Sequence, residues 1–411
     1  MKLIKIILII AISYPNILLA YEIGKKSLDD VTSPDFNTDK IVALKWEKNH
    51  EKLTALSLQC LADQNKGLSN LNNKPINCSR RVVKTEEMSL FNGSDQHPKS
   101  LDKYRLLIKT VRWPDDPTRQ VYEESDTAVK FAGTMKATCK LRISNSDDNE
   151  IDLAADGLLC AGHYGRFQFI HSMAISDNIR AEDTYNKIID WSKFAYLFSL
   201  EEIGHSEKYC EYWSKNNEYP HIKNAFQVEG VKSRNWCYER DIKFFDRLKN
   251  PKFWFSDQKK YPAWTLRTPF SHHCDSPWGS GDCTVIQDKE EINLSALGSI
   301  IHLIQDSYSL SHTNRGKTDL STETRCSNVQ HFYSYSNQDT KKHSTADKWP
   351  IFNTSCDSDS SGTLDPITAS AQIIWLHAKG IKDTAKVTEI ISKVYGSMDE
   401  SALSMPGIQY E

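Results

Sequence analysis

The sequence has almost no excess of charge of either sign. Its 51 lysine and arginine residues stand against 54 aspartate and glutamate residues, which gives a formal net charge of −3. Nucleic-acid binders commonly carry a strongly basic domain or stripe. We therefore expect that nucleic acid is not the main partner.

The chain also lacks a glycine-rich phosphate loop, an internal repeat and a series of alternating strands. Apolar residues instead recur at helical spacing, notably over 39–64, 162–213, 290–312 and 367–395. These patterns predict an all-α or mainly α fold, a multi-helix domain with long loops. Because no spare block of ~100 residues follows the helical part, residues 21–411 are expected to form a single domain.

No CxxC pair is present, so a cysteine-bound zinc site is not expected. The ten cysteines are an even number, which is typical of disulfides in an exported protein. With the cysteines bonded to one another, any metal ion must be held by His, Asp and Glu. The simplest pairing joins neighbours along the chain and closes short loops: 60–78, 139–160, 210–237, 274–283 and 326–356.

Beyond its first 20 residues the sequence lacks any run that is long and apolar enough to span a bilayer. Residues 1–20 combine early lysines, an apolar centre and the small terminal residue Ala20, which is the layout of a secretory signal peptide. Pro15 interrupts the run and argues against a retained transmembrane helix. We expect cleavage near Ala20 and an exported protein, extracellular or periplasmic; an uncleaved anchor is the alternative.

His302, Asp306 and His312 lie close together at the end of an apolar helical segment. Residues four apart share one helix face, so His302 and Asp306 can bind one metal ion together. A His–Asp hydrogen bond on a surface helix is the alternative for this pair. On a continuing helix His312 would lie about 9 Å beyond Asp306, too far to share one zinc ion. Either the chain bends after Ser309 or His312 binds a second ion.

Other histidines and aspartates recur in patterns that suit the same chemistry. His343 and Asp347 repeat the four-residue spacing. Two prolines rigidify the turn "WPDDP", which presents Asp115 and Asp116 as metal ligands or as a general base. An ordinary turn, core or surface role is the alternative for each residue taken alone. The single histidines that complete the set are His50, His163 and His171, with His272 as a weaker candidate.

Together these residues resemble the zinc-dependent phospholipase C / S1–P1 nuclease superfamily, and more closely its bacterial zinc metallophospholipase C branch. The resemblance extends from about residue 46 to 347, as islands separated by long insertions. Its specific part is His-x3-Asp-x5-His over 302–312 followed by a later His-x3-Asp. The looser matches are His50 in "HEKLTALSL", Asp115 in "WPDD" and His163 in "GHYG", for which His171 is a rival.

The resemblance implies an all-α domain that holds up to three zinc ions. In the family the mature N-terminal residue completes one zinc site, whereas Trp46, four residues before His50, lies inside the expected mature chain. The implied ligand groups are Asp115, His302 and His163 or His171 for the first ion; His50 and the bridging Asp306 for the second; and His312, His343 and Asp347 for the third.

Clustered zinc ions suit phosphodiester hydrolysis, because they lower the pKa of bound water and neutralise charge on phosphoryl oxygens. The resemblance implies a secreted phospholipase C that cuts a glycerophospholipid, with phosphatidylcholine as the expected substrate, into diacylglycerol and a phosphorylated head group. We expect a monomer that meets its phospholipid substrate at a membrane or micelle surface. The alternatives are a secreted single-strand nuclease with 3′-nucleotidase activity and a non-enzymatic binding protein with structural metal.

Overall fold

The computed structural model describes residues 49–66, 76, 78, 104–117, 119, 155–227, 237–241, 260–274, 283–315, 327–335, 338, 343, 346 and 363–407. The predictions for the signal peptide, Trp46, Asp347, Cys139 and the pair 326–356 lie outside these residues. In the described part, no helix has the length and apolar character needed to cross a membrane.

The predicted mainly α fold is confirmed. The strands described are two or three residues long and form three antiparallel pairs: β1 (Arg240–Asp241) with β2 (Lys260–Tyr261), β3 (His272–Cys274) with β4 (Cys283–Val285), and β5 (Thr313–Asn314) with β6 (His331–Phe332). The helices are α3 (Asn49–Lys66), α4 (Arg105–Thr110), α6 (Ala155–Tyr164), the 3-10 helix η3 (Gln168–His171), α7 (Ala181–Ser199), α8 (Tyr209–Lys215), α9 (Pro220–Phe226), α11 (Thr268–Ser271), α12 (Lys289–Asp306), α14 (Pro366–Ala378) and α15 (Thr384–Tyr395).

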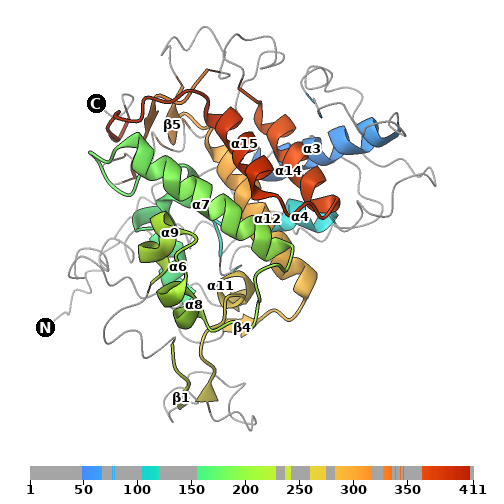
Figure 1. Cartoon of the computed structure of the whole chain (residues 1–411), viewed down its shortest axis with the longest axis vertical. Coiled ribbons are helices and arrows are strands. Elements are labelled where there is room, and N and C mark those ends of the chain that lie inside the picture. Colours follow the sequence, from blue (N-terminus) through green and yellow to red (C-terminus); the bar gives the residue numbers. More distant parts are fainter. Residues whose placement is uncertain are drawn as a thin grey trace, which may run out of the picture.

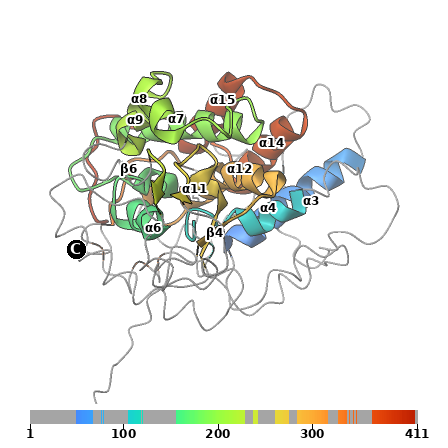
Figure 2. The same ribbon diagram turned by 90° about the horizontal axis from the view of Figure 1, so that it is seen from below.

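Helix α12 lies at the centre of the fold (Figures 1 and 2), packed against α7, α4, α14 and η3. It begins sharply because the Asp288 carboxylate accepts hydrogen bonds from the backbone N–H groups of Glu290 and Glu291. From Leu294 to Asp306 every residue is buried. A helix that is buried all round is a core element, so polar side chains in its last turn are held in a fixed position.

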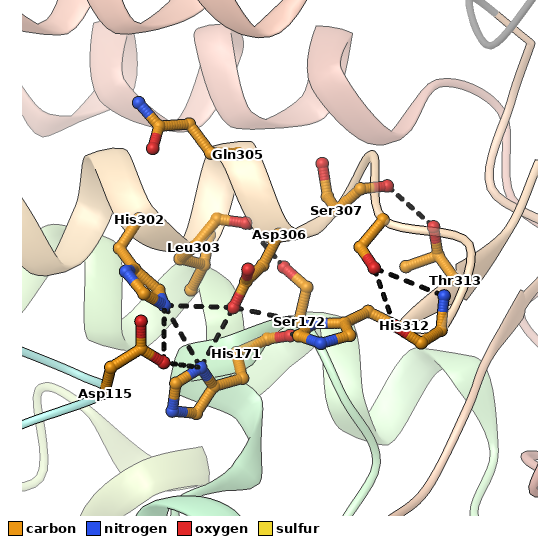
Figure 3. Close-up of polar contacts among 12 residues, drawn as sticks. Asp115, His171, Ser172, His302, Leu303, Gln305, Asp306, Ser307, His312 and Thr313 are labelled. Carbon is orange, nitrogen blue, oxygen red and sulfur yellow. Dashed lines mark hydrogen bonds and ion pairs between the residues drawn. The ribbon is translucent and has the colours of Figure 1, made fainter. Parts of the chain in front are cut away.

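The prediction of one helix through residue 312 is wrong, because α12 ends at Asp306. The Ser307 carbonyl, which would continue the helix, instead accepts hydrogen bonds from Thr313 Oγ1 (2.6 Å) and Arg315 Nε (2.8 Å). These side chains satisfy an end carbonyl of the kind that helix termini leave open. The chain therefore bends directly after Asp306, and His312 returns beside the end of the helix (Figure 3).

A glycine sets how closely α4 approaches α12. A Cβ atom at Gly298 would lie 2.8 Å from the Thr110 carbonyl oxygen and 2.9 Å from Val111 N. The Thr110 hydroxyl also donates to the Leu294 carbonyl (3.0 Å). Backbone thus packs on backbone, and the turn after α4 is fixed against the middle of α12.

Most of the aromatic residues that are described belong to the core. The Trp191 ring of α7 stacks on Phe226 with ring centroids 5.3 Å apart, and Phe226 stacks on Trp213 at 4.7 Å. Trp113 also stacks on Trp191 (6.1 Å). This cluster packs α7, α8 and α9 together, so these aromatics are not available to a ligand.

Two predicted disulfides are confirmed, Cys60–Cys78 and Cys210–Cys237. They are consistent with an oxidising compartment. Cys160 is also disulfide-bonded. The backbone register places Cys274 opposite Cys283 in the β3–β4 pair, which is consistent with their predicted pairing.

The predicted helical segment over 367–395 is two helices, α14 and α15. Gly380 has a left-handed φ of 63°, which ends α14, and the Asp383 carboxylate accepts from Ala385 N to begin α15. The two helices pack on each other, and α14 also packs on α3. This second packing fixes the start of α3 relative to α12.

Candidate metal centre

Six buried ligand-type side chains converge at the end of α12, and none is more than 2 % exposed. They come from five segments of the chain. These are His50 in the first turn of α3, Asp115 in the turn after α4, His163 in the last turn of α6, His171 at the end of η3, and His302 and Asp306 in the last two turns of α12.

The six residues form three overlapping groups that could hold metal ions. Within each group the ligand atoms all lie within 4.8 Å of one another. The groups share members, so the positions that ions would take adjoin each other. The three groups are His50, Asp115 and His302; Asp115, His163 and His171; and His171, His302 and Asp306.

The Asp306 carboxylate faces two sides of the cluster. Its Oδ2 lies 2.9 Å from His171 Nδ1 and 3.1 Å from His302 Nε2 (Figure 3), while its Oδ1 lies 3.2 Å from His50 Nε2. Asp115 is arranged in the same way, with Oδ1 3.6 Å from His302 Nε2 and Oδ2 4.0 Å from His50 Nε2. Each carboxylate can therefore serve two adjacent ions, one through each oxygen.

Backbone carbonyls fix the orientation of two of the histidines. The Nδ1–H of His302 donates to the Val111 carbonyl (2.9 Å), and the Nδ1–H of His163 donates to the Leu159 carbonyl (3.0 Å). A carbonyl only accepts, so Nδ1 carries the proton and Nε2 keeps its lone pair. In both rings the lone pair is on the nitrogen that faces Asp115.

Burial keeps the imidazoles of His163, His171 and His302 neutral at physiological pH. Desolvation lowers the pKa of His163 to about 3, with a further contribution from His171. It also lowers the pKa of His171 and of His302 to about 4. Burial alone would raise the pKa of Asp306, but His302 and the other histidines around it hold that pKa well below its usual range. Neutral imidazoles beside an ionised Asp306 carboxylate are the protonation states that metal binding requires.

His171 is held in place by the residue after it. Ser172 has a left-handed φ of 54°, which ends η3. Its hydroxyl donates to the Leu303 carbonyl of α12 (2.7 Å; Figure 3). The chain thus crosses α12 one turn from Asp306, and His171 points at that carboxylate.

A buried guanidinium anchors the turn that carries Asp115. Arg119 donates to the carbonyls of His272 (2.9 Å) and Phe270 (2.8 Å) and to the Ser295 hydroxyl (2.8 Å). Its Nε lies 3.2 Å from a carboxylate oxygen of Glu291. Arg119 therefore fastens the turn to α12 and to the α11–β3 segment at once.

His312 and His343 lie next to the cluster but belong to none of the three groups. His312 Nδ1 lies 2.7 Å from the His171 carbonyl and 3.4 Å from Asp306 Oδ2. The ring centroids of His312 and His343 are 5.3 Å apart. With Asp347 outside the described residues, the third ion stays a prediction.

Two other candidates lie outside the three groups. His272 is on β3, with its ring against Trp264 at 5.2 Å and its carbonyl bound by Arg119. Asp116 is buried beside Asp115, and its backbone closes the turn by bonding to Arg112 and Arg119. The rival histidines His163 and His171, by contrast, both face Asp115, at 3.8 and 3.9 Å.

Two residues that support the cluster were not predicted from the sequence: Gln305, which contacts His50, and Arg119. A polar residue inside the buried run "HLIQD" was a signal for the first. Arg119 had no signal, because its partners are mostly backbone carbonyls of distant segments.

The chain matches no known protein family, no curated protein and no solved structure. The metal centre therefore rests on the geometry of its own residues.

Proposed function

We propose that the protein is a secreted zinc-dependent phospholipase C that hydrolyses glycerophospholipids, with phosphatidylcholine as the expected substrate. The observation that carries this proposal is the pair of carboxylates, Asp115 and Asp306, each with one oxygen toward His50 Nε2 and the other toward His302 Nε2. Ions that share a carboxylate lie close together, as they do in the two-metal sites of phosphatases and nucleases.

The residues present fit a zinc cluster. Zinc takes imidazole nitrogens and carboxylate oxygens at about 2.0–2.2 Å. The Nε2 atoms of His163 and His171 are buried and have no hydrogen-bond partner among the described residues. A buried polar atom without a partner costs stability, and a bound ion would relieve that cost. His50, Asp115, His163, His171, His302 and Asp306 would hold the inner ions, and His312, His343 and Asp347 the third.

Bound zinc would supply Lewis acidity, which lowers the pKa of a water molecule and offsets negative charge on phosphoryl oxygens. The protein's own residues do the rest. The histidines and the two carboxylates hold a fixed geometry. Asp116, buried beside Asp115, is our candidate to orient the attacking water or accept its proton. The group that leaves phosphorus is the diacylglycerol alkoxide.

Two tyrosines support a choline head group as the ligand beside the metals. Tyr335 and Tyr164 are half-buried, with ring centroids 6.0 Å apart, and the His163 ring is 6.1 Å from Tyr335. Aromatic faces attract quaternary ammonium groups. The same rings can stack on a nucleobase, so a single-strand nuclease with 3′-nucleotidase activity is the second candidate.

The test compares phosphocholine release from phosphatidylcholine, with and without a chelator, to cleavage of single-stranded DNA by the same preparation. The double variant His302→Ala/Asp306→Ala removes two proposed ligands. His221→Ala is the matched control, because His221 pairs with Asp190 at the surface, outside the cluster.

Phosphocholine release that is lost with chelator and in the double variant, but kept in the control, supports the phospholipase. DNA cleavage with intact lipid assigns the nuclease activity instead. Bound zinc with no turnover of either substrate would refute both enzymatic proposals.

A further inference from the structure

We infer that Gln305 is a positioning residue that makes His50 a metal ligand. The inference rests on the metal centre of the proposed function. Gln305 lies in the last turn of α12, between His302 and Asp306, and is fully buried. Its side chain does not belong to any of the three ligand groups.

The Gln305 amide bridges two residues of α3. Its Oε1 lies 2.7 Å from His50 Nδ1, and its Nε2 donates to the Thr54 hydroxyl oxygen (3.1 Å). An amide oxygen can only accept, so the His50 nitrogen facing it must carry the proton. The lone pair of His50 is then on Nε2, which faces Asp306 Oδ1 at 3.2 Å.

Thr54 holds the other end of the Gln305 amide. With Nε2 bonded to the Thr54 hydroxyl, Oε1 is turned to His50. A reversed amide would present its NH2 group to His50 Nδ1 and favour the other tautomer, whose lone pair points away from Asp306. Because ring orientation and tautomer control whether an imidazole binds metal, the Gln305 amide controls a ligand of the cluster.

Two of the other histidines of the cluster use a different device. His302 and His163 donate to backbone carbonyls, which cannot be changed by substitution. His50 depends on a side chain, so its position can be tested by mutation. Its ring is also stacked on His302 with centroids 3.7 Å apart. A displaced His50 ring would therefore disturb His302 as well.

A neutral amide suits this place better than a carboxylate in the metal-free protein. Asp115 and Asp306 already put two carboxylates in the cluster, and both are buried. A third buried carboxylate raises the cost of desolvation and repulsion until cations bind. Gln305→Glu should therefore lower the melting temperature of the metal-free protein and yet hold zinc as tightly as the wild type, or more tightly.

The test measures zinc affinity and stoichiometry by chelator competition and the visible absorption of the cobalt-substituted protein, for full-length variants. Gln305→Met removes the acceptor at similar size and should weaken one zinc site by about 10–100-fold. Thr54→Val, which removes the hydroxyl that holds the amide nitrogen of Gln305, should weaken the same site by a smaller factor. Gln305→Glu should restore it.

Gln372→Met is the matched control, because Gln372 donates to the Ile76 carbonyl away from the cluster. It should leave zinc affinity unchanged. If Gln305→Met binds zinc as tightly as the wild type, the inference is overturned. It is also overturned if Gln305→Glu loses as much zinc affinity as Gln305→Met. If Gln305→Met does not fold, the Glu and Val variants still decide. Because the readout is metal binding, an inactive wild type that binds zinc refutes the proposed function and leaves this inference intact.

Discussion

Replacing Gly298 with alanine tests whether the α4–α12 contact positions the metal centre. The new Cβ would lie 2.8 Å from the Thr110 carbonyl oxygen, whereas ordinary contacts begin near 3.4 Å. The α4 backbone must therefore move by about 0.6 Å. The atoms that the new Cβ meets are backbone atoms of Thr110 and Val111, so rotation of a side chain cannot relieve the clash.

Two effects of opposite sign set the magnitude. Glycine to alanine in a helix interior normally gains about 1 kcal/mol. Overpacking a well-filled core costs about 1–3 kcal/mol. Since the clash is with backbone, we expect the upper part of that range and a net loss of about 1–2 kcal/mol.

The assay is urea unfolding of Gly298→Ala beside zinc titration. For the unfolding assay Gly162→Ala is the control, because a Cβ there meets its nearest neighbours at 3.6–3.8 Å, which is ordinary contact. One of these neighbours is Nε2 of the ligand His171, so this variant is not a control for the zinc titration. Val111 also holds His302, so Gly298→Ala should weaken zinc binding as well. Gly298→Ala that is as stable as the wild type, or more stable, would refute the close packing and the reasoning built on it.

Three further predictions concern stability and the centre. The metal-free protein should lose stability as pH falls from about 6.5 toward 4, because the unfolded histidines bind protons that buried His171 and His302 do not; each contributes roughly 1.4 kcal/mol per pH unit. Urea titrations at several pH values measure this slope, and bound zinc should reduce it. Replacing Cys60 and Cys78 with serine should cost about 3 kcal/mol, because the bond closes a loop of 18 residues; an unchanged urea midpoint would contradict it. Arg119→Met should weaken zinc binding more than Arg119→Lys, since the lysine keeps one charged donor to the Glu291 carboxylate; equal zinc affinities in the two variants would show that the anchor does not position Asp115.

Local spacing was enough to predict part of the site. His302 and Asp306 share a helix face because residues four apart always do, and their 3.1 Å contact follows from the helix alone. The pairs Cys60–Cys78 and Cys210–Cys237 were also predictable, because neighbouring cysteines close short loops. Helices were predicted correctly where apolar residues recur at helical spacing over a long segment.

Tertiary structure decided what spacing could not. The end of α12 at Asp306 depends on Arg315, a side chain from beyond the bend. Both His163 and His171 face Asp115 because η3 packs on α6 and α12. The contact of Gln305 with His50 joins residues 255 positions apart. The sequence by itself determined which residues could bind metal and which of them share a helix turn, since those follow from the local period. Which residues meet across helices was decided by packing, because only the buried surfaces of distant segments fix where the helices lie against one another.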